Sequence, residues 1–234
     1  MAPIRKGDGT PLEIPGVQEV RTGDGRVFFE GGAIPENVVD NFEDSNANPA
    51  GVYDAGETLA DYYSGDIEEF SRESNASIIG ETGVESTGEF GYIISTPEDG
   101  LNRYIQQGET FNIFIRPNTT DAAPGILFGA QDLDNHLGVR LQGFQSGMEI
   151  FERVEGSFND VESNSWEFTE GEVYRLEVDW KNGGEVDFKV FNNQESEEAS
   201  LSWDNPDDLF ADAVGVGLYT NNGPAQYDEF IVVE

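Results

Sequence analysis

The two-residue period of the segment 173–190 constrains the fold more than any other feature of the sequence. Apolar residues occupy every second position of 174–180 and again of 186–190, with mainly charged residues between them. Because the side chains of a β-strand alternate between its two faces, each segment predicts a strand with one buried and one exposed face. The intervening Lys-Asn-Gly-Gly at 181–184 favours a tight turn. Together these features predict an antiparallel hairpin whose apolar face lies on a core.

Comparable strand signals run from about residue 38 to the C-terminus, separated by clusters of Gly, Asn, Asp and Pro. The segment 59–70 is ambiguous, and no helix of ordinary length is predicted. Roughly twelve short strands joined by regular turns predict an all-β fold, a two-sheet antiparallel jelly-roll sandwich over residues 37–234. Besides the hairpin, the clearest strand signals lie at 111–115, 125–130, 137–141 and 148–150.

The charge of the chain indicates the solvent in which it folds. Forty-seven acidic residues stand against twelve basic ones, which gives a net charge of −35 over 234 residues. Such charge opposes compaction, yet 16 Phe, 8 Tyr and 3 Trp argue against disorder. At molar salt the Debye length falls to ~3 Å, so neighbouring carboxylates interact weakly. We therefore expect folding in concentrated salt, and no nucleic-acid or membrane partner, because both would repel the chain.

Residues 1–36 differ from the body in charge and in sequence. Residues 1–26 hold four basic and four acidic residues, and an Arg-x-Gly-Asp-Gly motif occurs at 5–9 and again at 21–25. Gly-Asp-Gly favours a tight turn, so we interpret residues 1–36 as an arm of two short hairpin-like units. Such units cannot bury a core of their own. We expect the arm to anchor the body to a partner or to sister copies, with a frayed terminus as the alternative.

Six motifs follow one another along the body, at 125–132, 135–140, 166, 174–180, 215–219 and 225–230. Their order resembles the concanavalin-A-like lectin/glucanase superfamily in its laminin-G-like branch, over residues ~38–234. The opening Val-Asp-Asn-Phe-Glu at 39–43, the arm and the acidic, lysine-poor composition also resemble haloarchaeal tailed-virus structural proteins. The first resemblance implies a sandwich fold, and the second implies a role in a virion.

These resemblances imply a virion structural protein of a haloarchaeal tailed virus, displayed as a capsid turret, decoration or tail fibre and contacting a host surface glycan or glycoprotein. The alternative is a cellular haloarchaeal carbohydrate-binding or glycoside-hydrolase-like module. The first ten residues lack the apolar segment of a signal peptide. We therefore expect assembly in the host cytoplasm and localisation in the virion. A homo-oligomer that contacts other virion proteins through the arm is expected.

The sequence offers no complete catalytic set. Retaining glycosidases need two carboxyl groups ~5 Å apart, but Glu177 and Asp179 have no third carboxylate beside them on their predicted strand. Glu149 and Glu152 fall on opposite faces of an ideal strand. The chain has no cysteine and a single histidine, which leaves no disulfide, thiolate zinc site or cysteine nucleophile. We predict that the protein is not an enzyme.

The lectin-like resemblance implies a structural Ca²⁺ where the first and last strands of the sandwich lie side by side. Glu43, with Asp40 or Asp44 nearby, and Asp228 are the candidate ligands, because Ca²⁺ prefers carboxylate and carbonyl oxygens. The alternative is that these carboxylates are simply solvated.

Glycan sites on this fold combine an aromatic ring with polar side chains and a Gly-rich loop. The candidates for such a site are Asp132, Asn135, His136, Arg140 and Trp166. Trp203 is an alternative aromatic platform, and the loop 219–223 is an alternative binding loop.

Overall fold

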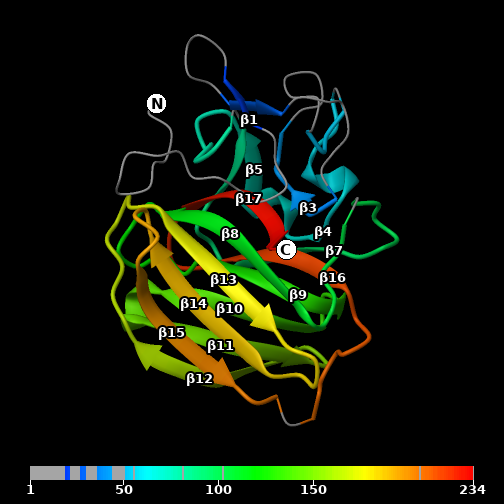
Figure 1. Cartoon of the computed structure of the whole chain (residues 1–234), viewed down its shortest axis with the longest axis vertical. Helices are drawn as coiled ribbons and strands as arrows, with labels where there is room; N and C mark the ends of the chain where they lie inside the picture. Colours follow the sequence, from blue (N-terminus) through cyan, green and yellow to red (C-terminus); the bar gives the residue numbers. More distant parts are fainter. Residues whose placement is uncertain are drawn as a thin grey trace.

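The computed structural model describes residues 19–21, 27–29, 36–43, 51–54, 56–80, 82–101, 103–205 and 207–233. These residues form β-strands and three short 3-10 helices, and none of them belongs to a longer helix. The all-β prediction is confirmed (Figure 1). Within the same residues, no helix has the length and apolar character needed to span a bilayer.

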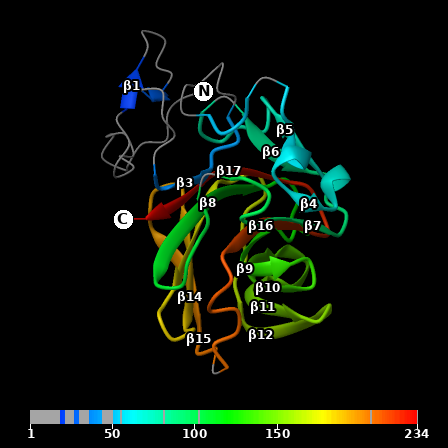
Figure 2. The ribbon, with the colours of Figure 1, turned by 90° about the vertical axis from the view of Figure 1, so that its right-hand side faces the viewer.

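Fifteen of the described strands form two antiparallel sheets that face each other, as the edge-on view in Figure 2 shows. The seven-stranded sheet contains β4 (Ser64–Gly65), β7 (Gly91–Ser95), β9 (Gly125–Asp132), β10 (Asn135–Gln142), β11 (Gly147–Val154), β12 (Ser157–Ser165) and β16 (Gly215–Thr220). Its strand order is β12-β11-β10-β9-β16-β7-β4. This sheet carries the candidate site described below.

The eight-stranded sheet closes the other side of the core. Its strands are β3 (Val38–Asp40), β5 (Phe70–Glu73), β6 (Gly83–Ser86), β8 (Glu109–Pro117), β13 (Tyr174–Trp180), β14 (Val186–Asn192), β15 (Glu197–Trp203) and β17 (Ala225–Val233). The order is β15-β14-β13-β8-β17-β6-β5, and β3 also pairs with β17. The predicted two-sheet sandwich is therefore confirmed.

The hairpin predicted from the alternation of 174–190 is present as β13 and β14. Leu176 pairs with Val190 and Trp180 pairs with Val186, and all four side chains are fully buried between the sheets. The turn is held by a hydrogen bond that the Lys181 N–H donates to the Glu185 carbonyl at 2.8 Å. Across the core, the ring of Trp180 lies 5.4 Å from that of Phe128 in β9, which links the two sheets.

The ambiguous segment 59–70 is two 3-10 helices separated by a short strand. Helix η1 (Leu59–Asp61) follows Thr58, whose N–H donates to Asp61 Oδ2 at 2.7 Å. Strand β4 then pairs with β7, and η2 (Ile67–Glu69) leads into β5. A third 3-10 helix, η3 (Gly143–Gln145), joins β10 to β11. These short elements explain why no single periodicity is visible in the sequence.

The first and last strands of the body lie side by side, as the resemblance implied. Asp40 in β3 pairs with Phe230 in β17, and Val38 pairs with Ile231. The register of β17 shifts between Asp228 and Ile231 in its pairing with β8, and Glu229 adopts a left-handed φ of 51° there. At this irregularity the consecutive side chains of Asp228 and Glu229 are both buried.

Within the predicted arm, β1 (Glu19–Arg21) and β2 (Val27–Phe29) form a separate antiparallel pair. Residues 1–18, 22–26 and 30–35, which include both Gly-Asp-Gly motifs, lie outside the described residues. The division into an arm and a body, and the anchoring role of the arm, stay predictions.

Candidate functional site

The candidate site lies on the outer face of the seven-stranded sheet. Strand β10 turns Leu137, Val139 and Leu141 into the core between the sheets. Its alternate residues therefore point outward, and Arg140 pairs there with Glu149 of the neighbouring β11. Residues directly opposite each other on antiparallel strands share a face. The outer face thus gathers side chains from β10, β11, β12 and β16.

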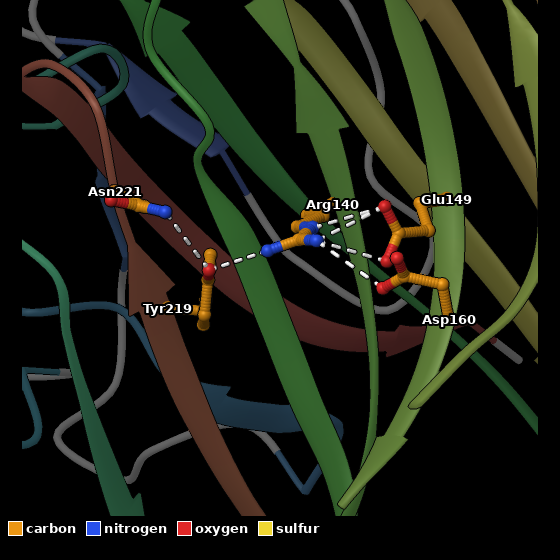
Figure 3. A network of polar contacts seen from close by, with 5 residues as sticks. All are labelled: Arg140, Glu149, Asp160, Tyr219 and Asn221. Carbon is orange, nitrogen blue, oxygen red and sulfur yellow. Dashed lines mark hydrogen bonds and ion pairs between the residues drawn. The ribbon is translucent and has the colours of Figure 1, made fainter. Parts of the chain in front are cut away.

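Arg140 is the centre of a polar network on this face (Figure 3). Its Nη2 donates to both carboxylate oxygens of Glu149, at 3.0 and 3.1 Å, and to Asp160 Oδ1 at 3.4 Å. Its Nη1 donates to the Tyr219 hydroxyl at 2.5 Å, and that hydroxyl also accepts from Asn221 Nδ2 at 3.5 Å. Only 7% of the Arg140 side chain and 1% of the Glu149 side chain are exposed, against 57% for Asp160. The buried guanidinium therefore holds the exposed Asp160 and the buried Tyr219 in place.

The carboxyl group of Glu149 has a raised pKa. Burial raises its pKa to about 8, and the hydrogen bond and negative charge of Asp160 raise it further, while Arg140 acts in the opposite direction. Arg140 donates to both carboxylate oxygens of Glu149 but makes a single, longer contact with Asp160. The exposed carboxylate of Asp160 then remains an acceptor for a ligand hydroxyl.

Aromatic side chains surround this network and form what we call the aromatic ladder: Phe158, Phe151, Tyr219 and Phe90. Phe158 stacks on Phe151 with ring centroids 4.7 Å apart, Phe151 lies 5.4 Å from Tyr219, and Tyr219 lies 6.0 Å from Phe90. The Arg140 guanidinium lies 4.8 Å from the Phe158 ring and 5.2 Å from the Tyr219 ring, which adds cation–π attraction. The ladder runs continuously over the outer face.

The two ends of the ladder are open to solvent. Phe90 is 53% exposed and Phe158 is 37% exposed; of the large apolar side chains that the structure describes, only Phe144, at 42%, is comparably exposed. The inner rings, Phe151 and Tyr219, are buried. An exposed ring beside a fixed hydrogen-bond acceptor is the arrangement that a sugar needs, because its apolar face stacks and its hydroxyls donate.

Gly138 leaves the space on β10 that the Phe151 ring of the ladder occupies. A Cβ atom at this position would lie 2.3 Å from Cζ of Phe151, so any larger residue would collide with the ring. The tip of the Phe151 ring therefore passes over Gly138 of β10, and the ring reaches Tyr219 on β16, although two strands separate β11 from β16.

The structure brings four of the five predicted glycan residues to one sheet. Asp132 and Asn135 flank the turn between β9 and β10, where Asp132 Oδ1 accepts from Asn135 Nδ2 at 2.9 Å. His136 and Arg140 follow on the outer face of β10. Trp166 lies apart: its ring contacts Phe168 and Tyr174 and packs against the main core. The alternative platform, Trp203, also packs against that core.

His136 is a buried member of the face. Its ring lies 5.5 Å from Tyr92 and 6.4 Å from Phe151. Burial lowers its pKa to about 4, with Arg153 adding to the effect, so the imidazole is neutral at neutral pH. The side chain of His136 thus acts as part of the aromatic packing beside the ladder.

Sequence reasoning missed Glu149, Asp160, Phe151, Phe158 and Phe90 as site residues. One signal for Glu149 was available: the predicted strand 148–150 points this residue away from the core. The alternative loop 219–223 did contribute Tyr219 and Asn221. Strand β12 gave no comparable signal, because only Phe158 and Val161 of its residues are apolar and most of its side chains are exposed.

The predicted calcium ligands lie in a second, fully buried group of carboxyl groups. Asp228 Oδ2 accepts from the backbone N–H groups of Ile78 and Ile79, at 2.7 and 2.6 Å, and Glu43 Oε1 accepts from Thr82 at 2.9 Å. Asp228 Oδ1 is buried and accepts no hydrogen bond. Burial and the charges of Glu229 and Glu43 raise the pKa of Asp228 well above its usual range.

This group fits a calcium ion only in part. The Asp228 Oδ1 atom is free to coordinate a cation, but Ca²⁺ takes six to eight oxygens. Across the described ranges, no three acidic or histidine side chains gather in a metal-binding arrangement, and Asp44 lies outside those ranges. Calcium binding stays a prediction.

The fold has counterparts among solved structures. The chain matches the carbohydrate binding module CBM66 from Bacillus subtilis with a TM-score of 0.51 and 12% identity, covering 74% of this chain and 95% of that one. It matches a B. subtilis protein of unknown function with a galectin-like fold with a TM-score of 0.50 and 11% identity, covering 73% and 88%. At this identity the likeness establishes the fold alone.

A third match is with the GH43 BlXynB protein from Bacillus licheniformis, with a TM-score of 0.56 and 12% identity. It covers 93% of this chain but only 46% of that one, so less than half of the GH43 chain corresponds to this fold. The sequence itself matches no protein-family model and no curated protein.

Proposed function

We propose that this protein is a carbohydrate-binding β-sandwich that holds its glycan on the outer face of the seven-stranded sheet. The observation that carries the proposal is the pairing of an exposed ring, Phe158, with an exposed carboxylate, Asp160, which Arg140 fixes in place. A ring and an oriented acceptor are the two elements of sugar recognition. A carbohydrate binding module shares the fold, which supports the proposal without locating the site.

We propose binding without hydrolysis. The two carboxyl groups of the site, Glu149 and Asp160, both contact Arg140, and Glu149 is almost completely buried beneath it. A glycosidase needs both carboxyl groups to reach one glycosidic bond. Here a bound sugar reaches Asp160 alone, so a general acid and a nucleophile cannot act together.

The experiment measures binding to polysaccharide that has been extracted from the host surface and immobilised. It compares the wild-type chain with Phe158→Ala and Asp160→Asn variants in molar NaCl. Both substitutions are expected to weaken binding about tenfold, since the first removes the stacking ring and the second replaces a charged acceptor with a weaker, neutral one. Phe144→Ala and Glu162→Gln are the matched controls. Phe144 is a comparably exposed ring outside the ladder, and Glu162 of β12 pairs with Ile150 of β11, which faces the core. Equal binding by all five proteins would refute the site. Release of reducing sugar ends would refute the absence of catalysis.

The virion role is a separate proposal that rests on the charge of −35 and on the repeated arm at 1–36, whose residues 1–26 carry no net charge. If it holds, several weak glycan sites on one particle would give the avidity that attachment to a host cell requires. Mass spectrometry of purified haloarchaeal virus particles would find this chain as a stoichiometric component. A cellular carbohydrate-binding module would instead be found on host cells or in the medium.

Calcium is tested by thermal unfolding in molar NaCl with millimolar Ca²⁺ or with a chelator. If Glu43 and Asp228 hold the ion, calcium at about 100 times its dissociation constant stabilises the fold by about 2.7 kcal/mol. Asp228→Asn is expected to abolish this difference, because it removes the charge on the buried Oδ1 side. A wild-type chain with the same melting temperature in both buffers would rule the ion out.

A further inference from the structure

The exposed ends of the aromatic ladder lie far apart on the sheet. Phe158 belongs to β12 at one edge, and Phe90 directly precedes β7, with four strands between β12 and β7. Neighbouring strands lie ~4.8 Å apart, so one sugar ring cannot touch both phenylalanines. The ladder joins these ends in three ring-to-ring steps, none longer than 6.0 Å. Each step is comparable to the length of one sugar unit.

Polar side chains accompany the ladder between its ends. Asp160 lies at the Phe158 end, and Asn221, which is half-buried, donates to the hydroxyl of the central Tyr219 at 3.5 Å. Each can exchange hydrogen bonds with ring hydroxyls of a chain that passes above the buried rings. The polar groups therefore follow the same line as the aromatic ones.

The charges of the face select against an anionic ligand. The two arginines of the face are both paired, Arg140 with Glu149 and Asp160, and Arg153 with Asp134 at 3.2 Å. The carboxylates of Asp160 and Asp134 are more than half exposed, whereas both guanidinium groups are largely covered. A uronate or sulfate would meet these carboxylates without gaining a free cation, and the net charge of −35 adds to the repulsion.

We infer that the ligand of this site is a neutral, linear oligosaccharide of three or more sugar units, which extends from Phe158 on β12 to Phe90 beside β7. The terminal units stack on the two exposed rings, and the units between them bond to Asp160 and Asn221. The inference rests on the proposed function and adds the length, the direction and the charge of the ligand.

The test is calorimetric titration in molar NaCl with neutral gluco-, xylo- and manno-oligosaccharides of one to six units, and with oligogalacturonides of the same lengths. Affinity for the preferred neutral series is expected to rise at least tenfold between one and four units and then level off. Phe90→Ala and Phe158→Ala are each expected to lose about five- to tenfold for the four-unit ligand, and the double variant is expected to lose the dependence on length. Phe144→Ala, an exposed phenylalanine outside the ladder, serves as the control.

Three outcomes separate this inference from the proposed function. Equal affinity for one and four units, or a Phe90→Ala variant with unchanged affinity, would overturn the extended ligand while leaving glycan binding intact. Preference for oligogalacturonides would overturn the neutral charge. Failure of every neutral and acidic glycan, with the protein folded by circular dichroism, would overturn the proposed function itself.

Discussion

At the scale of single residues, Arg140 supports the site from below. All three nitrogens of its guanidinium donate to Glu149, Asp160 or Tyr219, and the side chain is almost completely buried. A buried cation contributes to stability mainly because its removal would leave its buried partners unpaired. Arg140 is therefore a positioning residue, and the ligand contacts fall to its exposed neighbours.

Replacement of this cation tests that role. We expect Arg140→Met to lower the free energy of unfolding by about 3 kcal/mol, because Glu149 and Tyr219 lose a buried partner. Asp160→Asn is expected to cost less than about 1 kcal/mol, since Asp160 is mostly exposed. Urea unfolding in molar NaCl measures both, and Arg140→Met/Glu149→Met is expected to recover part of the loss. Equal costs for the two single variants would contradict a buried supporting role.

The spacing of Gly138 under Phe151 gives a second prediction at this scale. Gly138→Ala would place a methyl group 2.3 Å from Cζ of Phe151, so the ring must move away from its position against Tyr219. We expect a loss of about 1–3 kcal/mol in stability, typical of overpacking, together with weaker glycan binding. Gly171→Ala, at a position with open space and a left-handed φ of 77°, adds backbone strain without a side-chain collision and is expected to leave glycan binding unchanged. Intact glycan binding by Gly138→Ala would show that the ladder is not required.

At the scale of elements, strand β17 concentrates buried acid. Its Asp228 and Glu229 lie near Glu43 and near Asp40 of β3, and all four side chains are buried. Burial raises the pKa of Glu229 to about 8, with Glu43 and Asp40 adding to the effect, and it raises the pKa of Asp40 to about 6 against opposing hydrogen bonds. These carboxyl groups therefore lose their protons at a higher pH in the folded chain than in the unfolded chain.

This junction should make the stability of the fold decrease as the pH rises. An unfolded chain releases these protons near pH 4, whereas the folded chain keeps them up to pH 6 to 8, so stability falls as pH rises across that interval. We expect the melting temperature, measured with a chelator at constant molar NaCl, to decrease from pH 5 to pH 9. Glu229→Gln should raise the melting temperature at pH 8 and flatten the curve. Glu197→Gln on the exposed edge strand β15 is the control, and a flat wild-type profile would contradict the assignment.

How much of this could be predicted from the sequence also depends on the element. The regular alternation of 174–190 predicted β13 and β14, and the alternation of 137–141 predicted β10, whose outer face carries His136 and Arg140 in the structure. The partners of Arg140 could not be predicted, because Asp160 depends on a shifted register in β12 and Tyr219 comes from a strand far along the chain. Trp166 was chosen for its ring alone, and the sequence does not reveal that Tyr174 packs against it.

At the scale of the whole molecule, charge sets the conditions under which the sandwich folds. With 47 acidic and 12 basic residues, most carboxylates can have no cationic partner. The large apolar core opposes this repulsion, and salt shortens its range. We expect the melting temperature to fall as NaCl is lowered from ~3 M to ~0.1 M, where the Debye length grows to ~10 Å. An unchanged melting temperature would contradict the halophilic interpretation.

The most direct test of the glycan site maps its position on the folded chain. Isotope-labelled protein in molar NaCl is titrated with a neutral four-unit oligosaccharide that binds, and backbone amide shifts are followed by NMR. The account predicts perturbations along β10, β11, β12 and β16 and at Phe90, with none on β13, β14 and β15 of the opposite sheet (Figure 2). Perturbations confined to the eight-stranded sheet, or to the buried carboxyl junction at β3 and β17, would contradict it.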